Sequence, residues 1–483
     1  MNITAPALCV FLCITTLAWS SAAEPEHWLT PLVEAAASPL THRSEVNQAQ
    51  LEVRRSRLAI DREQAAWRPR FFADGSHNRR VESSNDATET GNQQRTIRVN
   101  EVRSEVGIAQ PLATGTNVQI SALSSRETNN RANALNQESW VSRVRLTINQ
   151  ELLRGRNRDA NLAPLNDARE QWEGDQERLQ QEIALSFRHL AEQWIAYGRS
   201  VAAHDHAEET LASASSTLEL AQARHHAGLV GRSELLARER DVVEQQAQLG
   251  RLQRAMRSER EQLRMSWGDV ALPPPPQDVD SDDTLPDIPA FAETIRGQLA
   301  AREIAAQQRA SHRADQAGMD SLTLSLGAGL SGRDGDGEGS WQQVNDADTY
   351  DVSVGLRYEH IIGGSRERAE RQRSRIALRQ QRLAYQASER EWHLSVDRAV
   401  RTLLDARSDV HERARIRQAV GEERDLIAAE LSEGTASIRE LIDAEQRLRS
   451  AEQALINARY SALESELILR ELTDTMPLPE IDL

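Results

Sequence analysis

Apolar residues recur at every seventh position along two separate stretches of the chain. The first series follows Gly228 and the second follows Gly434, and each begins seven residues past its glycine. Their members are Leu235, Val242, Leu249, Met256 and Leu263 in the first series and Leu441, Leu448, Leu455, Ala462 and Leu469 in the second. The repeated unit holds about two hundred residues, far more than the roughly 20 to 50 of a solenoid repeat. The pattern therefore predicts one large element present in two copies.

Each copy is expected to contain a short helix, a strand region, a very long helix, a glycine-marked turn and a medium helix. The predicted helices cover residues 41–67, 160–226 and 232–267 in the first copy and 287–318, 366–431 and 436–472 in the second. At a rise of about 1.5 Å per residue, each long helix extends ~100 Å, several times the width of a small domain. A medium helix and a short helix stacked end to end would match the length of a long one.

Apolar and polar residues alternate in the strand regions, as a half-buried strand requires. The apolar positions are Val144, Leu146 and Ile148 in the first copy and Leu322, Leu324, Leu326, Val352, Val354, Leu356 and Tyr358 in the second. A membrane barrel wall needs the same alternation. The first copy also contains a further hairpin around Thr114 and Gly115, and the pattern leaves open whether it joins the wall. The Gly- and Asp-rich segment 332–348 is expected to be an exposed turn.

Composition limits the classes of function. The formal net charge is −16, from 74 acidic and 58 basic residues, and every basic residue is arginine. General nucleic-acid binding needs a basic face, which an acidic chain does not favour. Aromatic residues make up only 4% of the chain, and the abundance of Ala, Gln, Glu and Arg is typical of coiled coils. No phosphate-binding loop, Ser/His/Asp arrangement or catalytic carboxylate pair stands out, so we expect neither an enzyme nor a cofactor.

Residues 1–23 are interpreted as a signal peptide, because an apolar run up to Trp19 is followed by small residues that suit cleavage before Glu24. The absence of Lys or Arg before the run is atypical. Both cysteines, Cys9 and Cys13, fall within it, so no disulfide or cysteine-bound metal is expected in the exported chain. Cys13 is an alternative lipid-attachment site, although no small residue precedes it.

The predicted organisation continues with two repeats and a linker. The first repeat covers 24–272, a linker rich in proline and aspartate covers 273–286, the second repeat covers 287–475, and a C-terminal tail covers 476–483. After the signal segment, no stretch approaches the roughly 18 uninterrupted apolar residues of a membrane-spanning helix, so membrane insertion would have to use strands.

A membrane barrel of these strands would have to be shared between chains. Outer-membrane barrels begin at about eight strands, because every backbone polar group in the wall must be hydrogen-bonded. One chain supplies four to six strands. The predicted fold class is therefore an α+β membrane protein, in which a long antiparallel coiled-coil tunnel is joined to a transmembrane barrel formed by several subunits.

Nearly the whole chain after the signal segment resembles the TolC-type outer-membrane efflux proteins. The resemblance rests on WRPRFFADG after the first short helix, on LTINQELLRGRNR and VGLRYEHIIGGSRER where strands lead into long helices, and on the turns AGLVGRSELL and EGTASIRELIDAEQRLRSAEQALINARY. It implies a homotrimer with a shared twelve-stranded barrel in the lipid of the outer membrane and a helical tunnel in the periplasm. The implied partners are a periplasmic adaptor and an inner-membrane pump of the RND or ABC type.

The turns at the far ends of the long helices are expected to face the periplasm. The resemblance implies that the adaptor contacts the turn residues Gly228, Leu229, Val230, Gly434, Thr435 and Ala436. Each glycine also permits the left-handed turn that ends a helix, and the two roles are compatible.

Glu440 and Asp443 occupy the positions at which the family carries an acidic pair, which implies a ring of carboxylates at the periplasmic constriction of a trimer. Such a ring attracts cations and repels anions. Ser437 and Glu440 also have the spacing of a capping box, and acids are favoured near a helix start, so both readings stay open. Ala436 stands where the family's gate has a basic residue, and Arg439 is the candidate substitute.

Two further sets of residues have more than one interpretation. Four histidines lack Cys and acid partners at ligand spacing and are interpreted as residues of a solvated helix rather than a metal site: His204, His206, His225 and His226. Three aromatic residues near strand ends suit either a belt at the membrane interface or packing inside the sheet: Trp140, Tyr350 and Tyr358.

The sequence therefore predicts a passive outer-membrane exit duct for efflux or type I secretion, with energy supplied by its partners. The alternative is a periplasmic or surface coiled-coil scaffold without channel activity, whose strands form soluble sheets. The cargo is not predictable, because a duct that accepts what its pump delivers needs no selective pocket.

Overall fold

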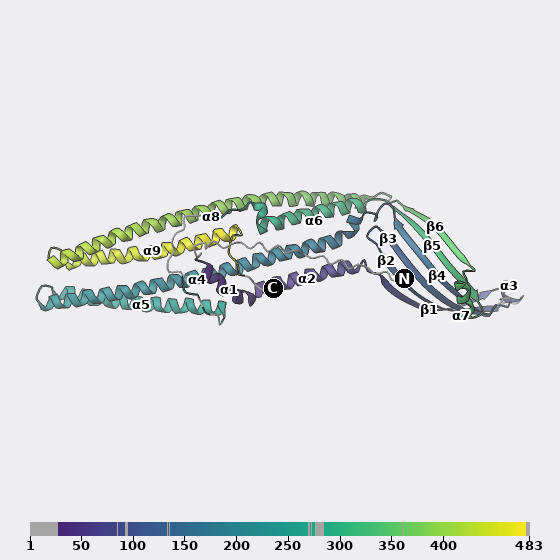
Figure 1. The fold of residues 1–483 in the computed structure, drawn as a ribbon, viewed down its shortest axis with the longest axis horizontal. Coiled ribbons are helices and arrows are strands. Elements are labelled where there is room, and N and C mark those ends of the chain that lie inside the picture. The colour runs from purple at the N-terminus through teal and green to yellow at the C-terminus, as the bar shows by residue number, and fades with distance from the viewer. Residues whose placement is uncertain are drawn as a thin grey trace, which may run out of the picture.

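The computed structural model describes residues 28–479, except for 85, 92–94, 133, 135, 269–270, 272, 276–284 and 361. The described chain is elongated, with a curved sheet at one end and paired helices running from the sheet to the other end (Figure 1). The predicted signal peptide at 1–23 and most of the predicted linker at 273–286 lie outside the described residues.

All six predicted helices are present. They are α2 (Ser44–Ala65), α4 (Arg158–His226), α5 (Arg232–Trp267), α6 (Ile295–Ala317), α8 (Ser365–Glu433) and α9 (Ile438–Leu472). The largest difference from prediction is the start of α6, at Ile295 rather than 287. A 3-10 turn, η1 (Phe291–Glu293), precedes Thr294, whose hydroxyl accepts a hydrogen bond from the Gly297 N–H at 3.1 Å and caps the helix. None of the described helices combines the length and the apolar character that crossing a membrane requires.

A further helix, α1 (Thr30–Thr41), is not predicted from the sequence. Leu32, Ala36 and Leu40 are fully buried and recur every four residues, which places them on one stripe of the helix. This stripe packs against α4, and just before α1 the Trp28 ring is stacked on Trp194 of α4, with ring centroids 6.2 Å apart. The helix therefore covers part of the main hydrophobic core.

Four helices lie abreast both near the sheet and at the far end of the helical part. Near the sheet the order is α2, α4, α6, α8, and at the far end it is α5, α4, α9, α8. α5 continues the line of α2 along α4, and α9 continues the line of α6 along α8 (Figure 1). Because α4 and α8 each have 69 residues, each extends about 100 Å. The predicted end-to-end stacking of medium and short helices is confirmed.

Arginines of α6 join the two halves of the helical layer near the sheet. Arg302 of α6 donates hydrogen bonds to Glu170, Glu173 and Glu177 of α4, at 3.0, 2.8 and 2.7 Å. The bonds to Glu177 raise the pKa of Arg302 above its ordinary value. Water screens this half-buried group, so its contribution to stability is modest. We call Arg302 and its three glutamate partners the Arg302 clasp. Arg309 and Arg313 of α6 also pair with Asp167 of α4, at 2.8 and 2.7 Å, and together these contacts hold α4 beside α6.

Six antiparallel strands form one continuous sheet, in the order β1-β2-β3-β4-β5-β6. They are β1 (Arg70–Ser84), β2 (Arg95–Pro111), β3 (Thr116–Asn129), β4 (Glu138–Glu151), β5 (Ser321–Asp334) and β6 (Tyr350–Glu359). The hairpin around Thr114 and Gly115 supplies β2 and β3, between β1 and β4. A twelve-stranded barrel of three chains requires four strands from each, so this sheet has two more than the resemblance implies.

Apolar residues of all six strands lie in register on one face of the sheet. One row contains Ala73, Val106, Ala122, Val144, Leu330 and Tyr350, and the next contains Phe71, Ile108, Ile120, Leu146, Ala328 and Val352. On β5 this face runs from Leu322 to Leu330, ~27 Å of strand at 3.4 Å per residue. At a strand tilt of about 40° this length spans ~21 Å of height, slightly less than the ~25 Å of a lipid-facing band. We call it the apolar face.

The opposite face of the sheet is polar. Arg145 of β4 reaches across Gly329 of β5 to Asp351 of β6, with 2.9 Å between the guanidinium and carboxylate. Ser125 of β3 donates a hydrogen bond to Glu101 of β2 at 3.0 Å. Together the two faces confirm the alternation predicted for the strands.

Part of segment 332–348 forms a helix, α7 (Gly337–Asn345), so the expectation of an exposed turn is wrong there. α7 packs on β4 and β5. Ser340 is fully buried, and its hydroxyl lies 2.8 Å from that of Ser142 on β4. The glycines that suggest a turn instead permit this contact, because a Cβ at Gly332 would lie 2.1 Å from the Ser340 carbonyl oxygen.

Aromatic residues mark the ends of the apolar face. On β6, Tyr350 and Tyr358 are 74% and 59% exposed in the single chain. Trp140 lies on the same face of β4, and the Arg126 guanidinium carbon lies 5.6 Å from its ring centroid. Rings at both ends of an apolar band are typical of an interface belt. Nearly every residue of the edge strand β6 is exposed in the single chain, so this exposure does not decide between an interface belt and packing inside the sheet.

Leu190 of α4 is fully buried in the main hydrophobic cluster, which also includes residues of α1 and α9. We expect Leu190→Ala to lower the free energy of unfolding by about 2–5 kcal/mol, because it removes buried methyl groups and leaves a cavity. Leu190→Met conserves volume and should cost less than about 1.5 kcal/mol. Thermal loss of the helical circular-dichroism signal in detergent measures both. Equal stability of the two variants would contradict the placement of Leu190 in the core.

Candidate functional site

The turn between α4 and α5 is tight and mostly solvent-exposed. Gly228 has φ +75°, and its N–H donates to the His225 carbonyl oxygen at 2.9 Å. A Cβ at Gly228 would meet no atom within 4 Å. Glycine is therefore favoured there by the positive φ and not by lack of space. Leu229 is 75% exposed, whereas Val230 is half-buried.

The turn between α8 and α9 has the same construction. Gly434 has φ +82°, with open space where a Cβ would stand. Thr435 donates to the Glu430 carbonyl oxygen from its backbone N–H at 2.9 Å and from its hydroxyl at 3.0 Å. Gly434 and Thr435 are exposed, and Ala436 is half-buried. The left-handed turn predicted at both glycines is confirmed.

The two turns contact each other. Leu431, Ile438 and Leu441 form a buried apolar cluster, and Val230 of the other turn and Ala436 pack against it. An Arg224 guanidinium of α4 also donates to a carbonyl oxygen at the end of α8, at 3.3 Å. The six predicted tip residues therefore divide into Gly228, Leu229, Gly434 and Thr435, which face solvent, and Val230 and Ala436, which join the two turns.

Glu440 forms the capping box that its spacing predicts. Its carboxylate accepts a hydrogen bond from the Ser437 N–H at 2.7 Å, and its own N–H donates to the Ser437 hydroxyl at 3.3 Å. The backbone hydrogen bond from Ser437 lowers the pKa of Glu440 below its ordinary value of 4.5. Asp443, one turn further along α9, is exposed, as is Arg439. The carboxylates of Glu440 and Asp443 both lie on solvent-facing positions of α9.

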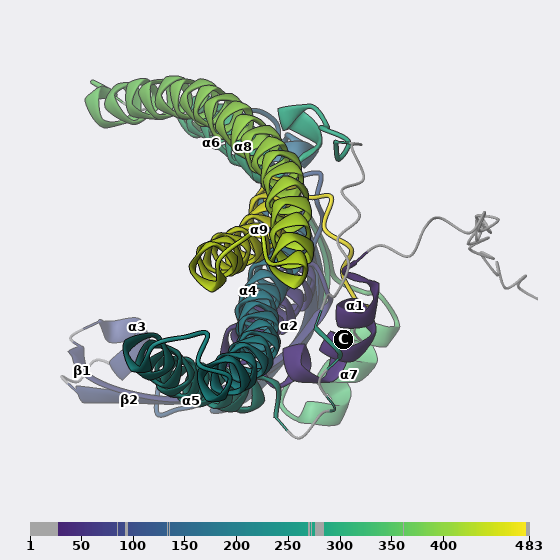
Figure 2. The ribbon, with the colours of Figure 1, turned by 90° about the vertical axis from the view of Figure 1, so that its left-hand side faces the viewer.

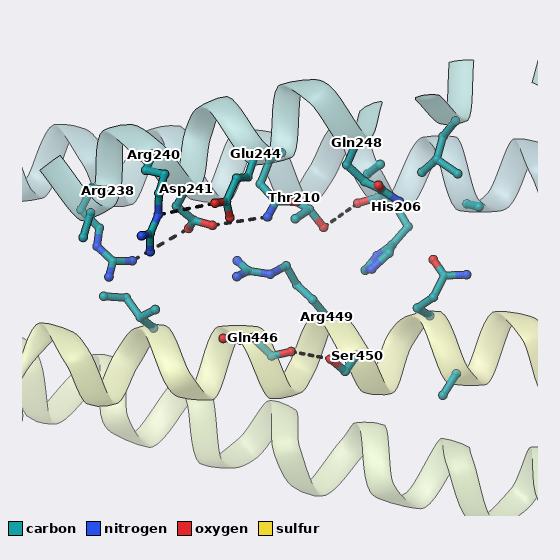
Figure 3. A pocket seen from close by; sticks show the side chains of 18 of the residues that line it. His206, Thr210, Arg238, Arg240, Asp241, Glu244, Gln248, Gln446, Arg449 and Ser450 are labelled. Atoms are coloured by element: carbon teal, nitrogen blue, oxygen red, sulfur yellow. Dashed lines mark hydrogen bonds and ion pairs between the residues drawn. The ribbon is translucent and has the colours of Figure 1, made fainter. Parts of the chain in front are cut away.

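A polar groove of about 770 Å³ separates the α4–α5 hairpin from α9 (Figure 3). Arg238 and Arg240 of α5 lie 3.9 and 3.4 Å from Asp241 and Glu244 of the same helix, and Arg449 of α9 points into the groove from the opposite wall (Figure 3). Since charged and amide groups dominate the lining, the groove can bind polar or charged surfaces and is unsuited to an apolar small molecule.

Glu445 is an interfacial acid that the sequence analysis does not identify. It lies on α9 beside the groove and accepts a hydrogen bond from the Ser213 hydroxyl of α4 at 3.4 Å. Burial raises its pKa, although Arg449 lies 3.9 Å away. No motif in the sequence marks Glu445. This carboxylate lies where the two hairpins meet.

His204 and His206 differ from the solvated residues predicted, and the expectation that the histidines lack nearby acid partners is wrong for His204. The side chains of His204 and His206 are mostly buried. His225 and His226 lie beside the exposed turn between α4 and α5. The two ring nitrogens of His204 lie 3.3 and 3.8 Å from Asp205 and Glu208. Ligand atoms of these three residues fall within 4.8 Å of one another. Three groups from about one helical turn leave most of a metal's coordination shell to water, and we assign no metal to them.

Comparison with known proteins identifies a family for the second copy. Residues 294–475 match the family described as "Outer membrane efflux protein". No curated protein matches the chain.

Several solved structures share the fold over nearly the whole chain. CusC is 15% identical, with a TM-score of 0.62 and coverage of 91% of both chains. A membrane protein from Pseudomonas aeruginosa is 16% identical, with a TM-score of 0.63 and coverage of 98% of this chain and 99% of that one. The open-state MtrE outer membrane channel of Neisseria gonorrhoeae is 14% identical, with a TM-score of 0.61 and coverage of 92% and 88%.

The capping box at the start of α9 is testable. Ser437→Ala removes the hydroxyl that accepts from the Glu440 N–H, which should cost about 1 kcal/mol and speed exchange of that amide about fivefold. Ser432→Ala is a matched control, because that exposed hydroxyl donates to a carbonyl oxygen within α8. Hydrogen exchange read by mass spectrometry measures both. Equal exchange in the two variants would contradict the cap.

The same cap should depend on pH. Because the folded-state pKa of Glu440 is lowered, its stabilising contribution is present above about pH 4.5 and is lost as pH falls through the lowered pKa. Exchange at the Ser437 amide, corrected for its intrinsic pH dependence, should therefore accelerate in acid. In Glu440→Gln this dependence should disappear, and an unchanged acid response in that variant would assign it to another group.

Proposed function

We propose that this chain, whose residues 294–475 match the outer membrane efflux protein family, is the exit duct through which a periplasmic adaptor and an inner-membrane pump deliver substrates outward. The channel lies in the outer membrane with its helices extending into the periplasm. Transport through it is passive, in efflux or type I secretion, and the energy is supplied by the pump.

The apolar face of the sheet is the observation that carries this proposal. Its rows cross all six strands, while charged and hydroxyl side chains occupy the other face. A sheet with lipid on one side and an aqueous lumen on the other needs this division. The long helices leave the same sheet and extend about 100 Å from it, so the lumen continues into a helical tunnel.

The duct is a homotrimer in this proposal, because one chain leaves its wall open. Among the residues that the structure describes, β1 pairs only with β2, and β6 pairs only with β5. Each edge strand thus presents backbone N–H and C=O groups that have no partner within the sheet. In hydrocarbon every such group costs several kcal/mol, so each edge must pair with another copy.

The helical layer has matching apolar edges. Along α8, six apolar residues between 46% and 61% exposed fall within about a third of the helix circumference at 3.6 residues per turn: Ile376, Leu383, Leu394, Leu404, Ile416 and Leu426. At the opposite edge, α2 exposes Leu51 and Leu58, and α5 exposes Leu236 and Val243. An apolar stripe at each side of the layer suits coiled-coil packing between subunits.

The exposed tips are the proposed contact for the adaptor. They end the two 69-residue helices at the point farthest from the sheet, and Leu229 leaves most of its side chain in solvent. Val230 and Ala436 would act indirectly, by holding the two turns together. The adaptor and the pump are partners carried over from the family.

Glu440 and Asp443 are the proposed periplasmic gate. Three copies would bring six carboxylates to the mouth of the tunnel, where they attract cations and oppose anions. The capping role of Glu440 leaves one carboxylate oxygen outside the cap, since the hydrogen bonds from Ser437 reach Oε2. Capping and ion binding are therefore compatible, and Ala436 provides no basic partner for closure.

The subunit interface along α8 provides the first test. Leu383→Asp with Leu394→Asp places charges on the apolar stripe, and we expect the detergent-solubilised protein to change from three chains to one in light scattering. Leu383→Met with Leu394→Met is the matched control and should stay trimeric. A trimeric aspartate variant would show that this stripe lies outside the interface.

The gate provides the second test. Glu440→Ala with Asp443→Ala should raise single-channel conductance in planar bilayers and weaken block by a trivalent cation about tenfold, because six carboxylates leave the constriction. Asp409→Ala with Glu412→Ala removes two acids at the same spacing from the middle of α8 and should change neither property. Unchanged conductance in the first variant would contradict the gate. A wild-type protein that forms no pore and is extracted from membranes by carbonate would favour a scaffold.

A further inference from the structure

We propose that three copies of this chain close an eighteen-stranded barrel, in which the β2–β3 hairpin is part of the wall and each β6 edge pairs with the β1 edge of a second copy. This inference rests on the proposed trimeric duct and specifies its wall. Each sheet edge thus pairs with another copy of this chain. The barrel is about 1.5 times as wide as one of twelve strands, because diameter grows roughly linearly with strand number.

The hairpin is built into the sheet along its whole length. β2 pairs with β1 from Arg70↔Ala109 to Ser84↔Arg95, and β3 pairs with β4 from Thr116↔Gln150 to Thr128↔Glu138. Withdrawing the hairpin would break both ladders and leave β1 without its pairing partner. A twelve-stranded wall would therefore require a rearrangement of β1 onto β4.

The turn of the hairpin is held where the wall meets the helices. Gly115 accepts a hydrogen bond from the Glu151 N–H at 3.0 Å through its carbonyl oxygen, and the Asn161 side chain of α4 donates to the Ala113 carbonyl oxygen at 2.9 Å. A Cβ at Gly115 would lie 2.2 Å from the Gly155 carbonyl oxygen, with φ at +77°. Only glycine fits this contact, so the turn is fixed beside the β4–α4 junction.

The faces of the hairpin match those of its neighbours. Ile108 and Ile120 lie in the same row as Phe71 on one side and Leu146 on the other. A hairpin folded into the lumen or out into water would have no use for this apolar row, whereas a lipid-facing wall requires it. The wall therefore stays apolar on its outer side without a break from β1 to β6.

Strand direction also permits closure. The sheet is antiparallel throughout and has an even number of strands, so β1 and β6 run in opposite directions. A β6 edge placed beside the β1 edge of the next copy continues the antiparallel order around the ring. One hairpin adds two strands and preserves this property.

The width of the wall matches the width of the helical layer. Six strands about 4.8 Å apart and tilted by about 40° cover ~38 Å of circumference. Four helices abreast at 8–10 Å cover about 32–40 Å. Four strands would cover only ~25 Å by the same geometry, and the barrel would have to narrow sharply above the helices.

The hairpin's position is tested by cysteines placed at two register pairs across β3 and β4, in full-length trimer reconstituted into lipid. Ile120→Cys and Leu146→Cys are partners on the apolar face, and Gln119→Cys and Thr147→Cys are partners on the polar face. We expect Ile120→Cys carrying a bimane label to be quenched by a lipid-bound nitroxide within about twofold of Leu146→Cys, because the two are neighbours in one wall. Gln119→Cys and Thr147→Cys should both react with a charged, membrane-impermeant thiol reagent.

The β4 positions act as matched controls, because β4 belongs to the wall with either strand count. Water reactivity at both Ile120→Cys and Gln119→Cys, together with lipid quenching at Leu146→Cys, would overturn the inference. Electron cryomicroscopy of the wild-type trimer counts the strands directly: eighteen support the inference, and twelve with a projecting hairpin exclude it. A conducting trimer with twelve strands would leave the proposed function intact, whereas a monomer without pores would overturn that function itself.

Discussion

The hydrogen-bonding requirement of the sheet edges governs the rest of this molecule. A strand in hydrocarbon cannot leave its N–H and C=O groups to water, so an open sheet of six strands is stable in a membrane only when both edges are paired. Wall formation and subunit association are consequently one event. The helical layer has no such requirement, since its backbone bonds are internal, and its cores around Leu190 and Trp392 lie within one chain. We infer that the helices can fold before assembly and the barrel cannot.

Duplication supplies the geometry that this assembly needs. Each copy contributes a long helix, and its shorter helices stack along the side of that helix, so four helices stand abreast at both ends of the tunnel. The first copy adds a hairpin to its strands, and the second adds none. The copies therefore differ in the sheet, and also in α1, a helix of the first copy that packs on α4. The family match lies over the second copy, at 294–475.

The sequence predicts the helices well because their signal is local and periodic. The seven-residue spacing of leucines and the glycines at 228 and 434 place α4, α5, α8 and α9 within a few residues of their observed ends. α1 escapes prediction because its stripe holds only Leu32, Ala36 and Leu40. The place of the hairpin is also beyond the sequence, since the outward positions of β1 continue after Ala73 as Gly75, His77 and Arg79 and give no clear apolar face. The apolar rows across the sheet can be recognised only once the register of the hairpin strands with β1 and β4 is known.

The candidate site likewise contains parts that the local sequence predicts and parts that it does not. The capping box of Ser437 and Glu440 is readable because both residues lie in one helical turn. The packing of Val230 against the cluster of Leu431, Ile438 and Leu441, the burial of Glu445 and the polar groove depend on how two hairpins pack, which no local pattern encodes. Whether Glu440 and Asp443 face a lumen depends on a third level, the arrangement of subunits.

The Arg302 clasp has a mechanical consequence. Glu177 is the glutamate of the clasp that lies nearest the tip, and α4 continues for 49 residues from there to His226. This part of the helix is about 75 Å long at 1.5 Å per residue. In the end-on view of Figure 2, α8 and α4 lie in a curved layer of helices. A rotation of only about 5° at the clasp would carry the tip through ~6 Å over that length. Because α4 beyond Glu177 packs against α1 and α9, such a rotation would have to carry these helices with it.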